Sequence, residues 1–262
     1  MNISHTFVIC AYKESEYLED MVRSIMAQTV SSKVLMTTST PNAYIRNIAD
    51  KYHIELKVRD GRPDIRDDWN FAYNSAETEW VTLAHQDDMY SPDYVAEMVK
   101  KLNDTPDAIA FLTDYIPIKH NSIGSRDENS KIRRFLRRPL LNQRMARSPF
   151  WKKEILAFGN SICCPSVTYH KSVLGPSFFT TDLKYNIDWD TFLKFSKIKG
   201  SIAYVDKPLT FYRISDEATS AAWIKNHTRE REDRILFSKF WPKWFVNFIM
   251  IFYVKAYDTY KK

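Results

Sequence analysis

Short apolar runs alternate with stretches of helical periodicity through the N-terminal part of the chain. Apolar runs occupy residues 6–10 and 80–84, the strand-like segments 33–36 and 54–58 lie between them, and the helical stretches are 15–26, 42–51 and 67–76. A short apolar run has the length of a buried strand, whereas apolar positions three and four residues apart mark one face of a helix. Strands that alternate with helices favour a parallel sheet with right-handed crossovers. The pattern therefore predicts an α/β fold.

The first helical stretch carries Leu18, Val22 and Ile25 on one face. Ser15 precedes this face and is a residue type that caps helix N-termini, so we expect it to be the N-cap. Glu19 then falls in the first turn, where a carboxylate is stabilised by the helix dipole. The chain is thus expected to open with a strand, a loop and a helix.

The apolar run that begins at Trp80 stops at two adjacent carboxylates, Asp87 and Asp88, with His85 two positions before the first of them. A strand that ends in carboxylates places hard oxygen ligands at the carboxyl end of a sheet, where open α/β folds bind their ligands. This arrangement indicates a site for a metal ion and a diphosphate. A strand followed by a solvated acidic turn would be the better account of the same aspartates in isolation.

Several short motifs follow one another in the order of a known enzyme family. They are residues 7–14, 17–19, 24–29, the ungapped segment 70–88, the segments 165–167 and 171–174, and the segments 188–190 and 208–213. Together they resemble a family 2 glycosyltransferase, from its opening strand and nucleotide loop, through its metal motif, to its catalytic region and closing Pro-Leu…Tyr-Arg element. The likeness runs through roughly residues 6–220, and an ordered set of motifs is far rarer by chance than any one of them.

The resemblance implies a GT-A fold, in which helices flank a Rossmann-like, mostly parallel central sheet, here with a C-terminal helical tail. It also implies a metal-dependent inverting glycosyltransferase of the hexosyltransferase type. The enzyme would move a sugar from a nucleotide-diphosphate sugar, with a UDP-sugar as the expected donor, to a hydroxyl of a glycan or lipid-linked glycan. The expected metal is Mn²⁺ or Mg²⁺.

The family's functional residues map onto positions of this sequence. The resemblance implies that donor binding involves Ala11, Tyr12, Glu14, Thr37, Arg66, Asn70, His85, Gln86 and Asp87, and that Asp87, His85 and Asp88 hold the metal. It assigns the catalytic base to Asp188, with Asp190 as the second candidate. A carboxylate can take the proton that the acceptor hydroxyl loses. Without the resemblance, Asp188 would also fit an exposed carboxylate at a helix start.

Three positions depart from the family's pattern. His85 stands where the metal motif usually begins with Asp, Met36 and Thr37 replace an acidic pair that helps to read the base, and Ser215 stands where many relatives have a histidine. Histidine prefers softer metals than Mg²⁺. His85 is therefore either a metal ligand or a neutral residue hydrogen-bonded beside the metal. The departures motivate an alternative function, a catalytically weakened glycosyltransferase-like protein that binds a nucleotide or a partner.

The composition agrees with an enzyme. The chain has 262 residues, of which 44% are hydrophobic and 15% aromatic, enough for a substantial core. We expect a nucleotide-sugar-binding half at residues 1–115, an acceptor-binding and catalytic half at 116–238, and an aromatic, basic C-terminal helix at 239–262. Only five glycines are present, with no Gly-rich phosphate loop, which argues against P-loop, dinucleotide-binding and nucleotidyltransferase enzymes. Three cysteines offer no disulfide framework, and the chain begins without a basic and apolar leader, so a cytoplasmic location is expected.

The basic residues are concentrated in two segments. Residues 131–153 contain nine basic side chains and no acidic one, and residues 239–262 contain five lysines against one aspartate. This concentration suggests a specific anionic partner: a membrane surface, towards which Arg133, Arg134, Arg137 and Arg138 would point, or the diphosphate of an acceptor. A solvated helix face explains the first segment as well. No nucleic-acid-binding module surrounds it, so nucleic acid is not expected.

The C-terminal segment combines aromatic and basic residues. Its apolar face comprises Phe240, Trp241, Trp244, Phe245, Phe248, Ile249 and Phe252, flanked by Lys239, Lys243, Lys255, Lys261 and Lys262. The uninterrupted apolar stretch is about ten residues, half of a bilayer span. It therefore suits a helix that lies in a membrane interface, although a helix packed on the core or against a second copy in a homodimer fits too. An interfacial helix would place the enzyme peripherally at the inner face of the cytoplasmic membrane, beside a lipid-linked acceptor of a bacterial surface-glycan pathway.

Overall fold

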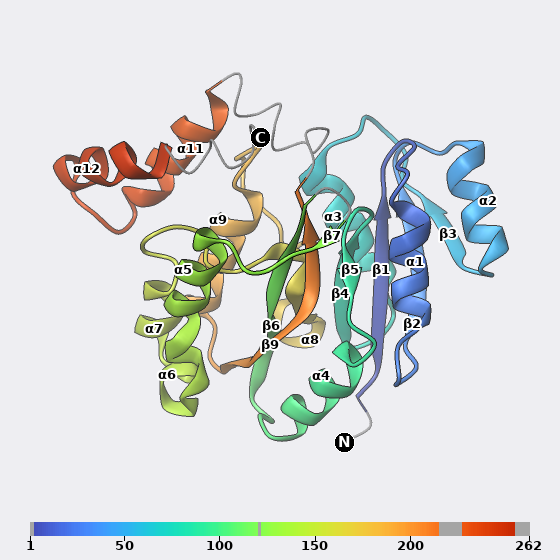
Figure 1. Ribbon diagram of the computed structural model, residues 1–262, viewed down its shortest axis with the longest axis horizontal. Coiled ribbons are helices and arrows are strands. Elements are labelled where there is room, and N and C mark those ends of the chain that lie inside the picture. Colours follow the sequence, from blue (N-terminus) through green and yellow to red (C-terminus); the bar gives the residue numbers. More distant parts are fainter. Residues whose placement is uncertain (1–2, 120–121, 215–226, 255–262) are drawn as a thin grey trace.

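The computed structural model describes residues 3–119, 122–214 and 227–254. One nine-stranded sheet with the order β3-β2-β1-β4-β8-β6-β9-β5 runs through this part of the chain, with β7 paired to β6, and helices lie on both sides of it (Figure 1). The sheet is therefore shared by the two halves that the sequence suggested.

The N-terminal half has the predicted alternation of strands and helices. Its elements are β1 (His5–Ala11), α1 (Leu18–Met26), β2 (Lys33–Thr38), α2 (Ala43–Lys51), β3 (Glu55–Val58), α3 (Ile65–Ser75) and β4 (Trp80–His85). The pairs β3–β2, β2–β1 and β1–β4 are all parallel. Phe7, Val8 and Ile9 are completely buried, because helices cover both faces of a parallel sheet and every side chain of β1 meets protein.

The remaining strands add antiparallel pairs, so the sheet is mixed although most of its paired residues are in the predicted parallel sense. These strands are β5 (Met89–Tyr90), β6 (Ala108–Lys119), β7 (Ser122–Ile123), β8 (Val167–His170) and β9 (Ser201–Arg213). β8 is antiparallel to both β4 and β6, and β6 and β9 are parallel. The chain enters β8 from the end of the sheet opposite to the start of β4, so it pairs with its neighbours only in the antiparallel sense.

Most of the remaining elements are helices. They are α4 (Tyr94–Asn103), α5 (Glu128–Arg137), η1 (Arg138–Leu141), α6 (Gln143–Arg147), α7 (Pro149–Glu154), η2 (Cys164–Ser166), α8 (Lys171–Leu174), α9 (Ile187–Leu193), η3 (Lys194–Lys197), α11 (Thr228–Phe237) and α12 (Lys243–Tyr253). The helices α5, α6, α7 and α12 lie together on the left of Figure 1. The C-terminal helical tail is thus present as α11 and α12.

The start of α1 differs from the expectation. The N-cap is Tyr17, which makes no side-chain capping bond, and not Ser15. Ser15 lies two residues earlier, and its carbonyl accepts a hydrogen bond from the N–H of Leu18 at 3.1 Å. The Ser15 hydroxyl instead accepts from the N–H of Tyr17 at 3.4 Å, so Ser15 stabilises the turn that leads into the helix and not the first turn of the helix itself.

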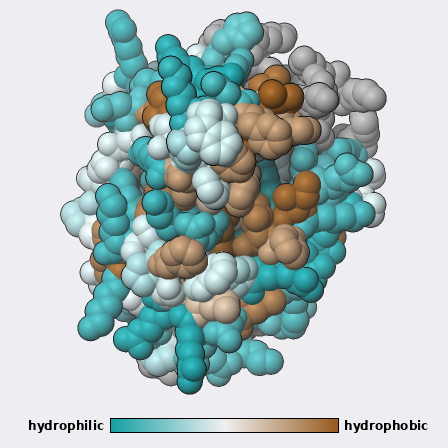
Figure 2. All heavy atoms as spheres, turned by 90° about the vertical axis from the view of Figure 1, so that its left-hand side faces the viewer, coloured by the Kyte–Doolittle hydropathy of each residue, from teal (hydrophilic) through white to brown (hydrophobic). Residues whose placement is uncertain are grey.

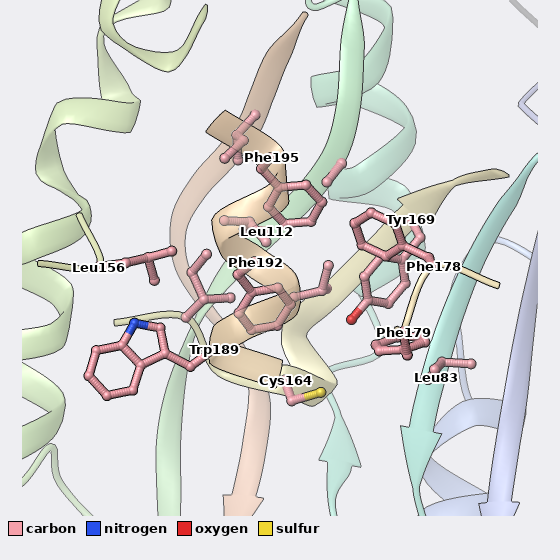
Figure 3. Packing of buried hydrophobic residues seen from close by; sticks show 14 of the residues in the cluster. Leu83, Leu112, Leu156, Cys164, Tyr169, Phe178, Phe179, Trp189, Phe192 and Phe195 are labelled. Carbon is pink, nitrogen blue, oxygen red and sulfur yellow. The ribbon is translucent and has the colours of Figure 1, made fainter. Parts of the chain in front are cut away.

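Helix α9 and the η3 turn that follows it are held by aromatic side chains. Trp189, Phe192 and Phe195 are completely buried in the larger of two hydrophobic clusters. Figure 3 shows Phe192 and Phe195 side by side in this cluster, with Trp189 on the side of Leu156. Trp189 also packs edge-to-face on Phe237 of α11, with the ring centroids 5.1 Å apart. Burial of this kind fixes the position and rotation of the helix and of the polar residues at its start.

Two arginines of the basic segment are structural. Arg137 is buried and forms an ion pair with the buried carboxylate of Asp114, at 2.5 Å. Arg134 donates two hydrogen bonds to Asp206, each 2.7 Å long. The expectation that Arg137 points towards an anionic surface is therefore wrong, because its charge is buried and paired inside the protein. The Arg134 side chain is 42% exposed, so the same expectation for Arg134 stays a prediction.

Candidate active site

The carboxyl ends of β1, β2 and β4 meet at a cavity of about 860 Å³, at the upper edge of the sheet in Figure 1. Eight of the residues expected in the site line it: Ala11, Tyr12, Glu14, Thr37, His85, Gln86, Asp87 and Asp188. The first seven come from the loops and strand ends of the N-terminal half, and Asp188 comes from the start of α9. The fold therefore brings the expected base to the expected donor-binding edge, as ligand sites at the carboxyl ends of strands require.

Gln86 ties the loops after β1 and β4 together. Its Oε1 accepts a hydrogen bond from the N–H of Tyr12 at 2.8 Å, and its Nε2 donates one to the carbonyl of Tyr12 at 3.0 Å. A side-chain amide has one donor and one acceptor group, and Gln86 uses both on the same residue. The two loops consequently form one rigid wall of the cavity.

A second wall of the cavity comes from the end of β2. Thr37 is buried, and its hydroxyl donates to the carbonyl of Ile9 at 3.3 Å. Beyond it, Ser39 donates to Asp68 at 2.9 Å, and Asp68 also accepts from Arg59 at 2.6 Å. Ser39 and Asp68 line the cavity with Thr37. The hydroxyl and carboxylate oxygens of this wall can form hydrogen bonds with a nucleoside.

The structure places Arg66 and Asn70 elsewhere, and neither lines this cavity. Asn70 donates to the carbonyl of Phe179 at 2.6 Å and accepts from its N–H at 3.1 Å, so both ends of its amide are used. Arg66 pairs with Asp67 at 3.0 Å and reaches Asp182 at 3.3 Å. These side chains connect α3 to the segment before α9, and the expectation that they contact the donor stays a prediction.

The two carboxylates after β4 have different surroundings. Asp87 lines the cavity, and burial raises its pKa. Asp88 lies behind it and is almost completely buried, and burial together with the charge of Asp87 raises its pKa well above the usual range. Asp88 Oδ1 accepts from the N–H of Arg213 at 2.9 Å, and Arg213 Nε donates to the carbonyl of Asp87 at 2.9 Å. The end of β9 is thus attached to the metal motif. Ser215, the third departure from the family pattern, lies outside the described residues.

His85 lies between Asp88 and the cavity. Its ring stacks on Trp69, with the centroids 5.2 Å apart, and its Nδ1 is 3.7 Å from Asp88 Oδ2. Burial lowers the pKa of His85 to about 4, so the imidazole is neutral near pH 7. Within the described residues, neither His85 Nε2 nor Asp88 Oδ2 has a hydrogen-bond partner although both atoms are buried. Buried polar atoms without partners are uncommon and often mark a place where an ion or a ligand binds.

His85 Nε2 and the Asp87 carboxylate can together bind a divalent cation when a ligand supplies the other coordinating atoms. In the part of the chain that the structure describes, no three His, Cys, Asp or Glu side chains are grouped to hold a metal by themselves. His85 Nε2 and the Asp87 carboxylate offer a nitrogen and an oxygen ligand at the cavity, and diphosphate oxygens can supply others. Metals in phosphate-transfer sites are commonly held by one or two carboxylates and substrate phosphates in this way.

Asp188 has the environment of a general base. Its Oδ2 accepts from the side-chain amide of Asn160 at 2.7 Å, and its Oδ1 accepts from the N–H of Trp189 at 2.7 Å. Burial raises its pKa to about 6. Asp190, the other candidate, forms an ion pair with Lys239 and does not line the cavity. The geometry therefore favours Asp188, since a base whose pKa lies near the working pH transfers protons most efficiently.

Glu232 holds the segment that leads into α9, a role that no pattern in the sequence indicates. Its carboxylate accepts hydrogen bonds from the backbone N–H groups of Lys184, Tyr185 and Asn186, at 2.7, 2.8 and 2.9 Å. Asp233 also accepts from the side chain of Asn186 at 2.8 Å. Glu232 and Asp233 are buried, whereas residues 228–234, being almost entirely charged, suggest a solvated helix. Helix α11 thus fixes the backbone immediately before Asp188.

Comparison with known families settles what kind of protein carries this site. Residues 6–168, well over half of the chain, match the family model described as Glycosyl transferase family 2. The chain belongs to this family. The predicted family and the predicted GT-A fold are both confirmed, with antiparallel pairs added to the mostly parallel sheet. No curated protein matches the sequence significantly.

Solved structures of glycosyltransferases share the fold at low sequence identity. The S. aureus TarS fragment 1–349 in complex with UDP-GlcNAc aligns with a TM-score of 0.66 at 14% identity, over 98% of this chain and 73% of that one. A longer TarS structure aligns with a TM-score of 0.62 at 12% identity, over 95% of this chain and 42% of that one. The mannosyltransferase PcManGT from Pyrobaculum calidifontis, in complex with GDP-Man and Mn²⁺, gives a TM-score of 0.59 at 16% identity, over 90% of this chain and 63% of that one.

Proposed function

We propose that the protein is a metal-dependent inverting glycosyltransferase of the hexosyltransferase type. It transfers a sugar from a nucleotide-diphosphate sugar, with a UDP-sugar as the first choice, to a hydroxyl of a glycan or lipid-linked glycan. The observation that carries the proposal is that Asp188, with its pKa raised to about 6, faces the same cavity as Asp87 and the carboxyl ends of β1 and β4. One cavity thus combines a proton acceptor with a site for a diphosphate.

The reaction needs one base and an in-line arrangement. Asp188 takes the proton of the acceptor hydroxyl while the hydroxyl oxygen forms a bond to the anomeric carbon. The bond between that carbon and the diphosphate oxygen breaks at the same time, and the nucleoside diphosphate leaves with the bonding electrons. Attack from the side opposite to the leaving group inverts the anomeric configuration, as in inverting glycosidases.

Asp87 and His85 are the residues that would hold the cation, Mn²⁺ or Mg²⁺. When bound, the cation would neutralise the negative charge that develops on the departing diphosphate. The neutral imidazole of His85 presents Nε2 as a ligand, and the Asp88 carboxylate lies behind the ring, with Oδ2 3.7 Å from Nδ1. A carboxylate behind a metal-binding histidine is a common arrangement in metalloproteins. In this assignment Asp88 acts through His85 and not as a direct ligand.

The relatives support the choice of ligands. TarS binds UDP-GlcNAc in one structure, and PcManGT binds GDP-Man and Mn²⁺ in another. From these ligands we infer that this protein also uses a nucleotide-sugar donor and a divalent metal. We also place the enzyme in the cytoplasm, in the biosynthesis of a bacterial polysaccharide.

Donor turnover tests the proposal. The protein is incubated with a panel of UDP-, GDP- and TDP-sugars, with Mn²⁺, with Mg²⁺ or with a chelator, and release of nucleoside diphosphate is measured. We expect release with one or a few donors, dependence on the metal, and a product of inverted anomeric configuration by NMR. Nucleotide binding without any turnover would favour the catalytically weakened alternative instead.

A further inference from the structure

Exposed hydrophobic side chains are concentrated on one side of the molecule. Eighteen large hydrophobic residues are exposed in the described part of the chain, and twelve of these lie either between Ile132 and Phe158 or between Ile235 and Val254. Both segments are on the left of Figure 1, in α5–α7 and in α11–α12. Figure 2, which faces this side, shows hydrophobic side chains gathered over its upper and central part between hydrophilic ones. A gathering of this kind marks an interaction surface.

Helix α12 has two apolar faces. Val246 and Met250 are buried against the core, and Tyr253 packs edge-to-face on Phe237. The opposite face is exposed: Trp244, Phe248, Ile251 and Phe252 have exposed fractions of 71%, 52%, 60% and 58%. Residues three and four positions apart share one face of a helix, so these four side chains form a single stripe. The packed face fixes α12 on the protein and leaves the aromatic stripe pointing outward.

Helices α5 to α7 extend this surface. They and the residues after them expose Ile132, Phe135, Leu141, Met145, Phe150 and Phe158. Phe158 joins the two groups, because its ring is 5.1 Å from that of Trp241, which directly precedes α12. Trp241 itself donates a hydrogen bond to the carbonyl of Ala157 at 2.7 Å. The C-terminal helix is thus attached to the end of α7.

The charges on this side are mostly positive, although Glu128 begins α5 and Glu154 ends α7. Residues 131–153 and 234–254 contain no acidic residue. Lys131, Arg138, Arg144, Arg147 and Lys243 are exposed among the apolar side chains. Aromatic rings with surrounding lysines and arginines fit the headgroup region of an anionic bilayer, where rings enter the interface and cations meet lipid phosphates. A second copy of the same surface would instead bring basic residues against basic residues.

We propose that the stripe on α12, together with the exposed side chains of α5 to α7, binds the surface of an anionic membrane. α12 lies in the interface and does not cross it, because its 11 residues span only about 16 Å. In the described residues no helix is long and apolar enough to traverse a bilayer. Lys255, Lys261 and Lys262, which the sequence placed beside this helix, lie outside the described residues.

The surface is connected to the active site. Tyr253 of α12 lines the cavity, and Phe237 of α11 contacts both Tyr253 and Trp189, the neighbour of Asp188. A membrane in contact with α12 would therefore lie near the side of the cavity that carries Asp188. That a lipid-linked acceptor reaches the base from the membrane rests on the proposed function, whereas membrane binding itself does not.

Vesicle flotation tests the proposal on the full chain. Vesicles of phosphatidylcholine alone are compared with vesicles that also contain phosphatidylglycerol, at low and high salt. One variant combines Trp244→Ser, Phe248→Ser and Phe252→Ser, and the matched control combines Met26→Ser, Ile123→Ser and Val173→Ser, which are exposed elsewhere. We expect the full chain to float with anionic vesicles, the α12 variant to bind roughly tenfold or more weakly, and the control to bind normally.

A second variant tests the charges, and folding is checked by thermal unfolding. Arg138→Gln with Arg144→Gln should weaken binding to anionic vesicles about fivefold for each charge removed, with no change for neutral vesicles. Failure of the unmodified chain to float, or equal binding by the α12 variant, would overturn the proposal. Concentration-dependent dimerisation that the α12 variant abolishes would assign the surface to a second copy instead. Flotation needs no turnover, so its outcome is independent of the proposed function.

Discussion

Asn160 donates a hydrogen bond from its side-chain amide to Asp188 Oδ2, over 2.7 Å. Asn160 lies after α7 and Asp188 at the start of α9, so the contact joins two segments that are separated by β8. The bond fixes the plane of the carboxylate and favours its charged form, while burial opposes that form and raises the pKa to about 6. The carboxylate is thereby held ready to accept a proton near neutral pH.

Asp188→Asn should lower turnover by roughly two to four orders of magnitude with little change in donor affinity, because asparagine cannot take a proton. The matched control is Asp190→Asn on the same helix, which removes only the partner of Lys239. Turnover and nucleotide affinity are measured for both variants. A larger loss of turnover in Asp190→Asn would transfer the role of base to that residue.

The pH dependence of kcat/KM should follow the ionisation of Asp188. The pKa of this carboxyl is raised to about 6, and only its deprotonated form accepts a proton. We therefore expect kcat/KM to be constant above this value and to fall about tenfold for each pH unit below it. A profile over about two pH units on either side checks this. The residual rate of Asp188→Asn should lack the acidic limb, and its persistence there would point to another group.

Asp87→Ala should reduce transfer by roughly two orders of magnitude or more, because a ligand of the proposed cation is lost. Titration of the nucleoside diphosphate with and without Mn²⁺ should show that the metal no longer tightens binding. His85→Asp should keep much of the activity, since it restores the residue type usual in the family. Full activity of Asp87→Ala, or unchanged activity in chelator, would exclude the metal site.

Glu232→Gln should lower kcat roughly tenfold to a hundredfold and leave nucleotide affinity unchanged, because the backbone before Asp188 loses its charged acceptor. Hydrogen exchange of the amides of Lys184, Tyr185 and Asn186 should become faster at the same time. Glu230→Gln is the control, since the ion pairs of Glu230 are with Arg234 and His227, both within four residues of it in the chain. If nucleotide affinity fell as much as kcat, Glu232 would support the whole site and not the base in particular.

Much of the N-terminal half is determined by the sequence alone. The run around Phe7, Val8 and Ile9 predicts a buried strand because covered strands need apolar residues at every position. The alternation with helical periodicity then predicts parallel strands. Open α/β sheets bind their ligands at the carboxyl ends of the strands. Asp87 and His85 could therefore be assigned to that edge from the sequence. All these inferences rest on the spacing of apolar and polar residues over short stretches of the chain.

Only the tertiary structure decided the partners of polar side chains. Asn70 and Arg137 are polar residues that sequence reasoning assigned to ligands, yet Asn70 binds the backbone of Phe179 and Arg137 pairs with buried Asp114. The charged residues around Glu232 are typical of a solvated helix, but the fold brings three backbone N–H groups to its carboxylate. Hydrogen bonds between segments far apart in the chain produce no regular spacing of residues, so the sequence pattern does not reveal them.

The same limit applies to the C-terminal helix. Its sequence revealed an aromatic, basic segment, but the division of its rings into a packed and an exposed face depends on what α12 meets. Trp241 and Tyr253 turn towards the end of α7 and α11, whereas Trp244 and Phe248 point outward. Hydrophobicity is a property of each residue, and burial is a property of the surface that the fold places opposite it. The sequence therefore determines which residues can be buried, and the tertiary structure decides which of them are.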